Sequence, residues 1–150
     1  MTTLGTDLHA VAFFMADHAS VESGKVYANG AFFTRLRFAT FPAVSNFSVV
    51  VVIEVPWREH HAPHSFSIRF EDADARPLFG DLQGEFRVGT APNAKVGDQT
   101  LVPMAAAVTN CKFPNPGDYV AVLRIDGAEA ERLAFRVVQV PADPGRGAGV

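Results

Sequence analysis

The stretch PGDYVAVLRIDGAEAERLAFRVVQV, residues 116–140, decides the fold. Pro116-Gly117 is a turn pair that brings Tyr119 to the start of an alternating run, VAVLRID. A second turn at Gly127 leads into another alternating run, ERLAFRVVQV. Alternation of apolar and polar residues with period two is typical of strands that bury one face. This stretch therefore predicts a β-hairpin.

The position of Tyr119 after the Pro-Gly turn resembles the tyrosine corner of immunoglobulin-like sandwiches, in which the Tyr hydroxyl donates a hydrogen bond to the backbone a few residues upstream. Period-two patterning also occupies most of the remaining chain, and no segment longer than a turn shows a helical period. We therefore predict an all-β fold, an immunoglobulin-like Greek-key β-sandwich of about seven to nine antiparallel strands. Strands are expected at 8–17, 26–38 with a possible break at Asn29-Gly30, 47–55, 65–71, 85–88, 100–109, 119–126 and 132–140.

The sandwich is expected to be one domain over residues 1–140. Residues 141–150 are rich in Pro and Gly and are predicted to be a disordered tail. Pro103 predicts that the strand at 100–109 lies at a sheet edge, because proline cannot donate a ladder hydrogen bond.

The composition argues against several classes of protein. The formal net charge is −3 and no basic run occurs, whereas nucleic-acid phosphates need clustered Lys and Arg, so we expect no nucleic-acid partner. The apolar stretch 10–16 is too short to span a bilayer, so we expect no membrane partner. Cys111 is the single cysteine, which excludes an intrachain disulfide and favours a reducing cytoplasm. The chain is therefore expected to be a cytoplasmic protein.

Most of the chain, beginning at the N-terminal hairpin, resembles an uncharacterised bacterial β-sandwich family of unknown function. The resemblance rests on Ala16-Asp17, Glu22, Gly24-Lys25, Gly30 and Phe32, followed by Phe41-Pro42, an Asp-rich turn at 72–75 and the Pro-Gly-x-Tyr corner. Many members have Cys where this chain has Ala16. The resemblance implies the fold and a bacterial origin, and it implies no chemistry.

The segment WREHHAPH, residues 57–64, is the strongest candidate for a metal site. Glu59, His60 and His61 are the predicted ligands, with His64 nearby, because imidazole and carboxylate suit zinc or copper. Adjacent side chains of an extended chain point in opposite directions, so His60 and His61 need a tight loop to converge. The alternative is a polar loop between two strands that merely tolerates histidine.

Trp57 and Arg58 in the same loop are candidate ligand-binding residues, because an exposed Trp stacks on sugar rings or anchors a protein partner. The alternative is that Trp57 folds back over the end of the sandwich, as large aromatics commonly do.

The residue types of a catalytic triad occur at Asp17, His18 and Ser20, but neighbours at a strand end cannot meet as a triad does. No nucleophile elbow, phosphate loop or His-Glu-x-x-His motif is present, so we predict no enzymatic activity and no cofactor.

A surplus of valine predicts an interface. If Tyr119 faces the core, Val120, Val122 and Val138 face outward on the same sheet. The run at 47–55 is apolar on both faces and is expected to join that sheet, which adds Val50 and Val52. A sheet face this apolar is covered by the chain's own N-terminal strand or the loop at 89–98, or it is buried against another chain. We interpret the protein as a non-enzymatic interaction module that forms a symmetric homodimer or binds a protein partner.

Overall fold

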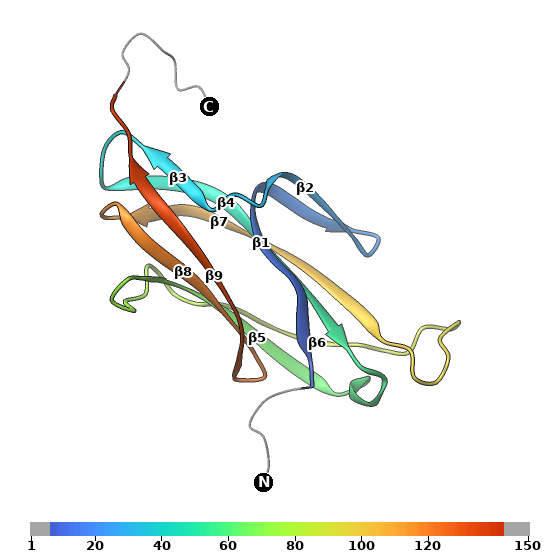
Figure 1. Ribbon diagram of the computed structural model, residues 1–150. Helices are drawn as coiled ribbons and strands as arrows, with labels where there is room; N and C mark the ends of the chain where they lie inside the picture. Colours follow the sequence, from blue (N-terminus) through green and yellow to red (C-terminus); the bar gives the residue numbers. More distant parts are fainter. Residues whose placement is uncertain (1–6, 143–150) are drawn as a thin grey trace.

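The computed structural model describes residues 7–142, in which nine strands form two sheets (Figure 1). One three-residue 3₁₀ helix, η1 (Trp57–Glu59), is the longest helix in this range. The predicted tail at 141–150 lies outside the described residues from position 143 onward. The strands are β1 (His9–Glu22), β2 (Lys25–Ala31), β3 (Arg35–Phe38), β4 (Ala43–Val55), β5 (Pro63–Asp72), β6 (Leu82–Arg87), β7 (Thr100–Phe113), β8 (Gly117–Ile125) and β9 (Ala128–Gln139).

The four-stranded sheet has the order β2-β1-β4-β7, and the five-stranded sheet has the order β3-β9-β8-β5-β6. The all-β prediction and the strand count are confirmed. β7 lies at the edge of its sheet, as Pro103 predicted. The prediction that all strands are antiparallel was wrong, because β3 pairs with β9 in parallel.

The main core lies between the two sheets and is rich in phenylalanine. Phe113 is fully buried and meets Phe135, Phe38 and Tyr119 with ring centroids 6.1, 6.2 and 5.1 Å away. The contacts with Phe135 and Tyr119 are edge-to-face, a geometry that stabilises an aromatic core beyond the area that it buries. The expected parity of β8 is confirmed, since Tyr119, Ala121, Leu123 and Ile125 all belong to this core.

The predicted corner bond is present. The Tyr119 hydroxyl donates to the backbone oxygen of Asn115 at 2.6 Å, and the ring stacks on Phe135 with centroids 5.8 Å apart. The bond ties the turn before β8 to the strand itself. The β8–β9 hairpin that follows is also confirmed, with Tyr119 paired to Phe135.

The strand expected at 26–38 is two strands that belong to different sheets. β2 ends at Ala31, and Phe32 then adopts a φ of +68°, a left-handed conformation that is rare for a bulky residue. Thr34 accepts a hydrogen bond from the Arg136 backbone at 2.8 Å, which begins the pairing of β3 with β9. The chain therefore crosses from one sheet to the other at residues 32–34.

The prediction that residues 47–55 join the sheet of β8 and β9 was wrong. β4 pairs with β1 and β7 in the four-stranded sheet. Val49, Val51 and Ile53 face the main core, and Val50 lies on the outer face. Val50 and Val52 are therefore on the opposite side of the molecule from Val120, Val122 and Val138.

Candidate functional site: two opposite sheet faces

The histidines of the loop between β4 and β5 have separate partners. The His60 ring packs on Trp57 with centroids 5.4 Å apart, and its two ring nitrogens are buried without a hydrogen-bond partner. His61 has a φ of +70°, and its Nε2 lies 2.9 Å from Thr90 Oγ1. Within residues 7–142 no three His, Cys, Asp or Glu side chains converge as metal ligands. The predicted ligands Glu59, His60 and His61 are thus not brought together.

His64 is the structural centre of this loop. Its buried ring places Nδ1 2.8 Å from Asp126 Oδ2, and Nε2 3.2 Å from the backbone oxygen of Glu59. The other Asp126 oxygen accepts the Ser65 backbone N–H at 2.9 Å. These bonds fasten the β4–β5 loop to the β8–β9 turn, and we call them the His64 clasp. Sequence reasoning included His64 only as an additional metal ligand.

We expect His64→Gln to lower the free energy of unfolding by about 2 kcal/mol, because it leaves buried polar groups without their partners. The expected loss of stability is smaller than for a fully buried pair because the Asp126 side chain is 29% exposed. Urea unfolding followed by fluorescence measures the change. His61→Gln, in the same loop but exposed, is the control, and an equal loss in both variants would contradict the clasp.

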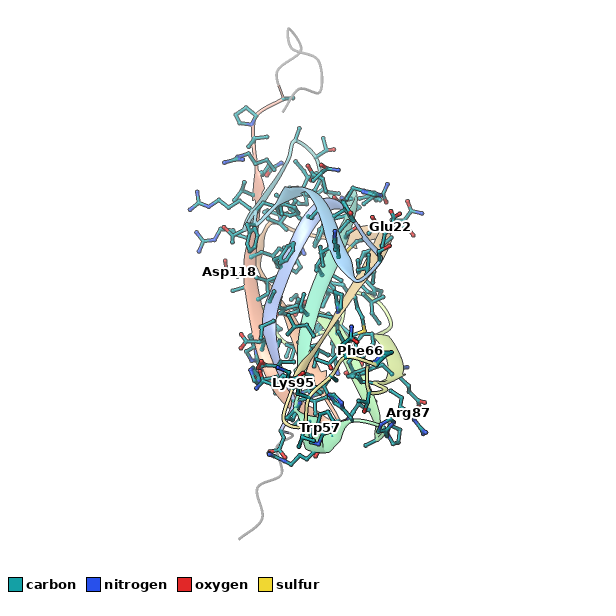
Figure 2. All side chains as sticks on the ribbon, turned by 90° about the vertical axis from the view of Figure 1, so that its right-hand side faces the viewer. Glu22, Trp57, Phe66, Arg87, Lys95 and Asp118 are labelled. Atoms are coloured by element: carbon teal, nitrogen blue, oxygen red, sulfur yellow. The ribbon has the colours of Figure 1, made fainter. Side chains whose placement is uncertain are left out.

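Trp57 lies at one end of the molecule, far from Glu22 at the tip of the β1–β2 hairpin (Figure 2). Trp57 is partly buried against His60, which agrees with the alternative that it folds back over this end. Arg58 Nη2 lies 2.9 Å from Asp7 Oδ2, so its guanidinium pairs with a carboxylate of the N-terminal segment. Both residues therefore pack or pair within the chain.

The outer face of the four-stranded sheet carries a second, smaller apolar cluster built on Phe14, Ala16 and Val50. Ala19, Val26 and Ala31 of the β1–β2 hairpin pack against it, and the Ala19 N–H donates to Ser48 Oγ at 3.2 Å. The hairpin thus covers part of this face, and Val50 is 0% exposed. Cover by the N-terminal strand was the alternative to an interface at this position, and for Val50 the structure shows that cover.

The rest of this outer face stays uncovered and is mostly apolar, with one ion pair at its end, His9–Glu54 at 2.9 Å. β1, β4 and β7 lie side by side here, and Val52 pairs with Ala12 on one side and Pro103 on the other. Val11 is 50% exposed and Leu101 56%. We call this surface the apolar face; its members are Val11, Ala12, Phe32, Val52, Leu101, Pro103 and Ala105.

Phe32 is the most exposed large residue of the apolar face, at 74%. Its ring stacks on Phe14 with centroids 4.4 Å apart, and its backbone N–H donates to Met15 O at 2.9 Å. These contacts hold the ring in one position despite its left-handed backbone. A strained backbone that displays a fixed aromatic ring points to a binding role, because such strain collects at functional sites.

The outer face of the five-stranded sheet is different in character. Val122 is only 1% exposed, because it lies in register between Arg69 and Arg132, whose stems cover it. Val120 and Val138 are half-buried. Three ion pairs cross or border this face: Arg69–Glu71 at 3.2 Å, Arg132–Glu129 at 2.9 Å and Arg136–Asp118 at 2.8 Å. Of the three valines predicted to form an interface here, Val122 is covered, and Val120 and Val138 are partly exposed among charged side chains.

Cys111 is buried in the main core, and burial raises the pKa of its thiol to about 11. We expect native protein to resist a thiol-specific reagent at pH 8, where only about one thiol in a thousand is ionised and the sulfur is out of reach. Unfolding in urea should release one reactive thiol per chain. Full reaction of the native protein within minutes would contradict this placement.

A family model described as "family of unknown function (DUF6941)" matches residues 11–138. No curated protein matches the chain. Among solved structures, the chain resembles the Pseudomonas fluorescens alkylpurine DNA glycosylase AlkC bound to DNA containing an abasic site analog, at 11% identity and a TM-score of 0.33. The match covers 83% of this chain and 30% of that chain, and a similarity this low carries no argument about function. No helix among residues 7–142 is long and apolar enough to cross a membrane.

Proposed function

Since the chain belongs to DUF6941, a family of unknown function, we propose its role from its own surfaces: a non-enzymatic interaction module that self-associates through the apolar face. The observation that carries this proposal is Phe32, a 74% exposed ring stacked on Phe14, on the same sheet face as exposed Leu101 and Val11. Contiguous exposed apolar surface commonly marks a contact site. A two-fold dimer is the simplest geometry, because one patch then serves both copies.

The size of the apolar face sets the expected strength of the dimer. Three strands about 4.8 Å apart over about six residues give roughly 300 Å² per copy, to which Phe32 adds its ring. Counted over both copies, this area is below the roughly 1,000 Å² of a stable specific interface and corresponds to a weak, transient contact. The dimer should therefore be weak and reversible, with a dissociation constant of about 10–100 μM.

The immunoglobulin-like Greek-key arrangement belongs to the same proposal. Its support is the Tyr119 corner bond and the alternation of strands between sheets: β4 in one, β5 and β6 in the other, β7 back in the first, β8 and β9 again in the second. The free, buried Cys111 suits a reducing compartment such as the cytoplasm of the bacterial host that the family resemblance implies.

Hydroxyl-radical footprinting at low and high protein concentration tests the proposal. Phe32 and Tyr27 are both exposed aromatic residues, but only Phe32 belongs to the apolar face. Tyr27 therefore serves as the internal control. We expect oxidation of Phe32 to fall at least about threefold at ~1 mM protein, where most chains are paired, with Tyr27 unchanged. Equal oxidation of Phe32 at both concentrations would overturn self-association through this face.

A further inference from the structure

Arginines that are far apart in the sequence gather on the outer face of the five-stranded sheet. Leu36 and Phe38 face the main core, so the residues that alternate with them on β3 point outward. The same parity on β5, β8 and β9 turns further arginines to this side. The members of this arginine face are Arg35, Arg37, Arg69, Arg124, Arg132 and Arg136.

Half of these arginines are already paired within the face, and half are not. Arg69, Arg132 and Arg136 form the ion pairs described above. Arg35 and Arg37 form no ion pair with any residue of the described range 7–142, and neither does Arg124, although its charge helps to lower the pKa of Glu129 after the Arg132 hydrogen bond. The face thus presents unpaired positive charge on a chain whose formal net charge is −3.

Two depressions contain unpaired arginines, one at each end of the face. The first, of about 250 Å³, is lined by Arg35, Arg136 and Thr34, with Asp118 held by Arg136. The second, of about 300 Å³, is lined by Arg124 and the neighbouring Ser65, Ser67, Gln83 and Glu85. A guanidinium with hydroxyl groups beside it is suited to a carboxylate, which it can bind through two parallel hydrogen bonds.

A short aliphatic patch lies between the two depressions. Val120 on β8 is half-buried, and its partner on β9, Ala134, is exposed beside it. Val122 is 1% exposed because Arg69 and Arg132 flank it on the neighbouring strands, so arginine stems line the rest of the path. Asp118 and Arg124 are six positions apart on β8, which corresponds to about 20 Å.

We propose that the arginine face binds an extended acidic segment of a partner protein. The segment carries two carboxylates about six residues apart, one for each depression, with small aliphatic side chains between them against Val120, Ala134 and the arginine stems. Charge complementarity selects the partner, and the placement of the two depressions along one strand selects an extended chain. This surface lies opposite the apolar face, so it does not depend on self-association.

Fluorescence anisotropy with a labelled Glu-Ser-Val-Ser-Val-Ser-Glu peptide tests the proposal on the wild-type protein at ~20 μM, where the arginine face is open in monomer and dimer alike. We expect saturable binding that weakens about tenfold in Arg35→Gln and in Arg124→Gln. Glu85→Gln should bind more tightly, because it removes a negative charge from the second depression. Arg76→Gln, on an exposed turn, is the control and should bind as the wild type does.

Three results would overturn the proposal. The first is absence of binding, and the second is equal binding of the peptide with both Glu replaced by Gln. The third is a single-stranded oligonucleotide that binds more tightly than the peptide and loses affinity in the same arginine variants, which would make phosphate the ligand. Circular dichroism of each variant separates lost binding from lost folding.

Discussion

Replacing Phe113 with alanine is expected to lower the free energy of unfolding by about 3–5 kcal/mol. Phe113, on β7 of the four-stranded sheet, is 0% exposed and contacts three rings of the opposite sheet: Phe38 on β3, Tyr119 on β8 and Phe135 on β9. Removing its ring leaves a cavity that these neighbours cannot fill, because their own strands are fixed by ladder hydrogen bonds. Urea unfolding measures the loss.

Phe32→Ala is the matched control for Phe113→Ala. It removes the same ring from an exposed position and should cost about 1 kcal/mol or less. A loss of less than about 1 kcal/mol in Phe113→Ala would mean that the two sheets do not share one packed core at this point.

Val50→Asp is expected to be the second severe change. Val50 is 0% exposed beneath the β1–β2 hairpin, in contact with the cluster of Phe14 and Ala16. A carboxylate there is buried without a positive partner, so we expect a loss of at least about 3 kcal/mol or detachment of the hairpin. Urea unfolding and hydrogen exchange of β2 distinguish these two results.

The control for Val50→Asp is Val96→Asp, because Val96 is 85% exposed. It should change stability by no more than about 0.5 kcal/mol. If Val50→Asp were equally mild, Val50 would face solvent, as the sequence interpretation of an open interface required.

The sequence predicted those structural features that depend on residues close together in the chain. Residues 116–140 contain both the turn and the alternation of the β8–β9 hairpin, so the Tyr119 bond and the core residues of β8 could be predicted. The edge position of β7 followed from one residue, Pro103. These features depend on residues that are close in the chain.

The sequence could not show what covers an apolar face. Periodicity indicated that residues 49–53 are apolar on both sides, but not that the β1–β2 hairpin lies on one side. It also could not show that β4 and β8 are in different sheets, because strand order depends on contacts between distant segments. The five predicted interface valines are consequently divided between two opposite faces.

Two further features depend on conformation or register. The left-handed backbone of His61 turns its ring to Thr90, which adjacency in the sequence did not reveal. The arginine face arises because β3, β5, β8 and β9 place their outward positions together. No basic run exists in the sequence, so the charge of this face appeared only in the fold.

Light scattering after size exclusion, over a range of loading concentrations, tests self-association through the apolar face most directly. The wild type should rise from 16.1 kDa towards twice that mass as the concentration passes ~100 μM. Val11→Glu should remain a folded monomer throughout, and Val96→Glu, a matched substitution away from this face, should behave as the wild type does. A wild type that stays at 16.1 kDa up to ~1 mM, or a Val11→Glu variant that still forms dimers, would contradict the account.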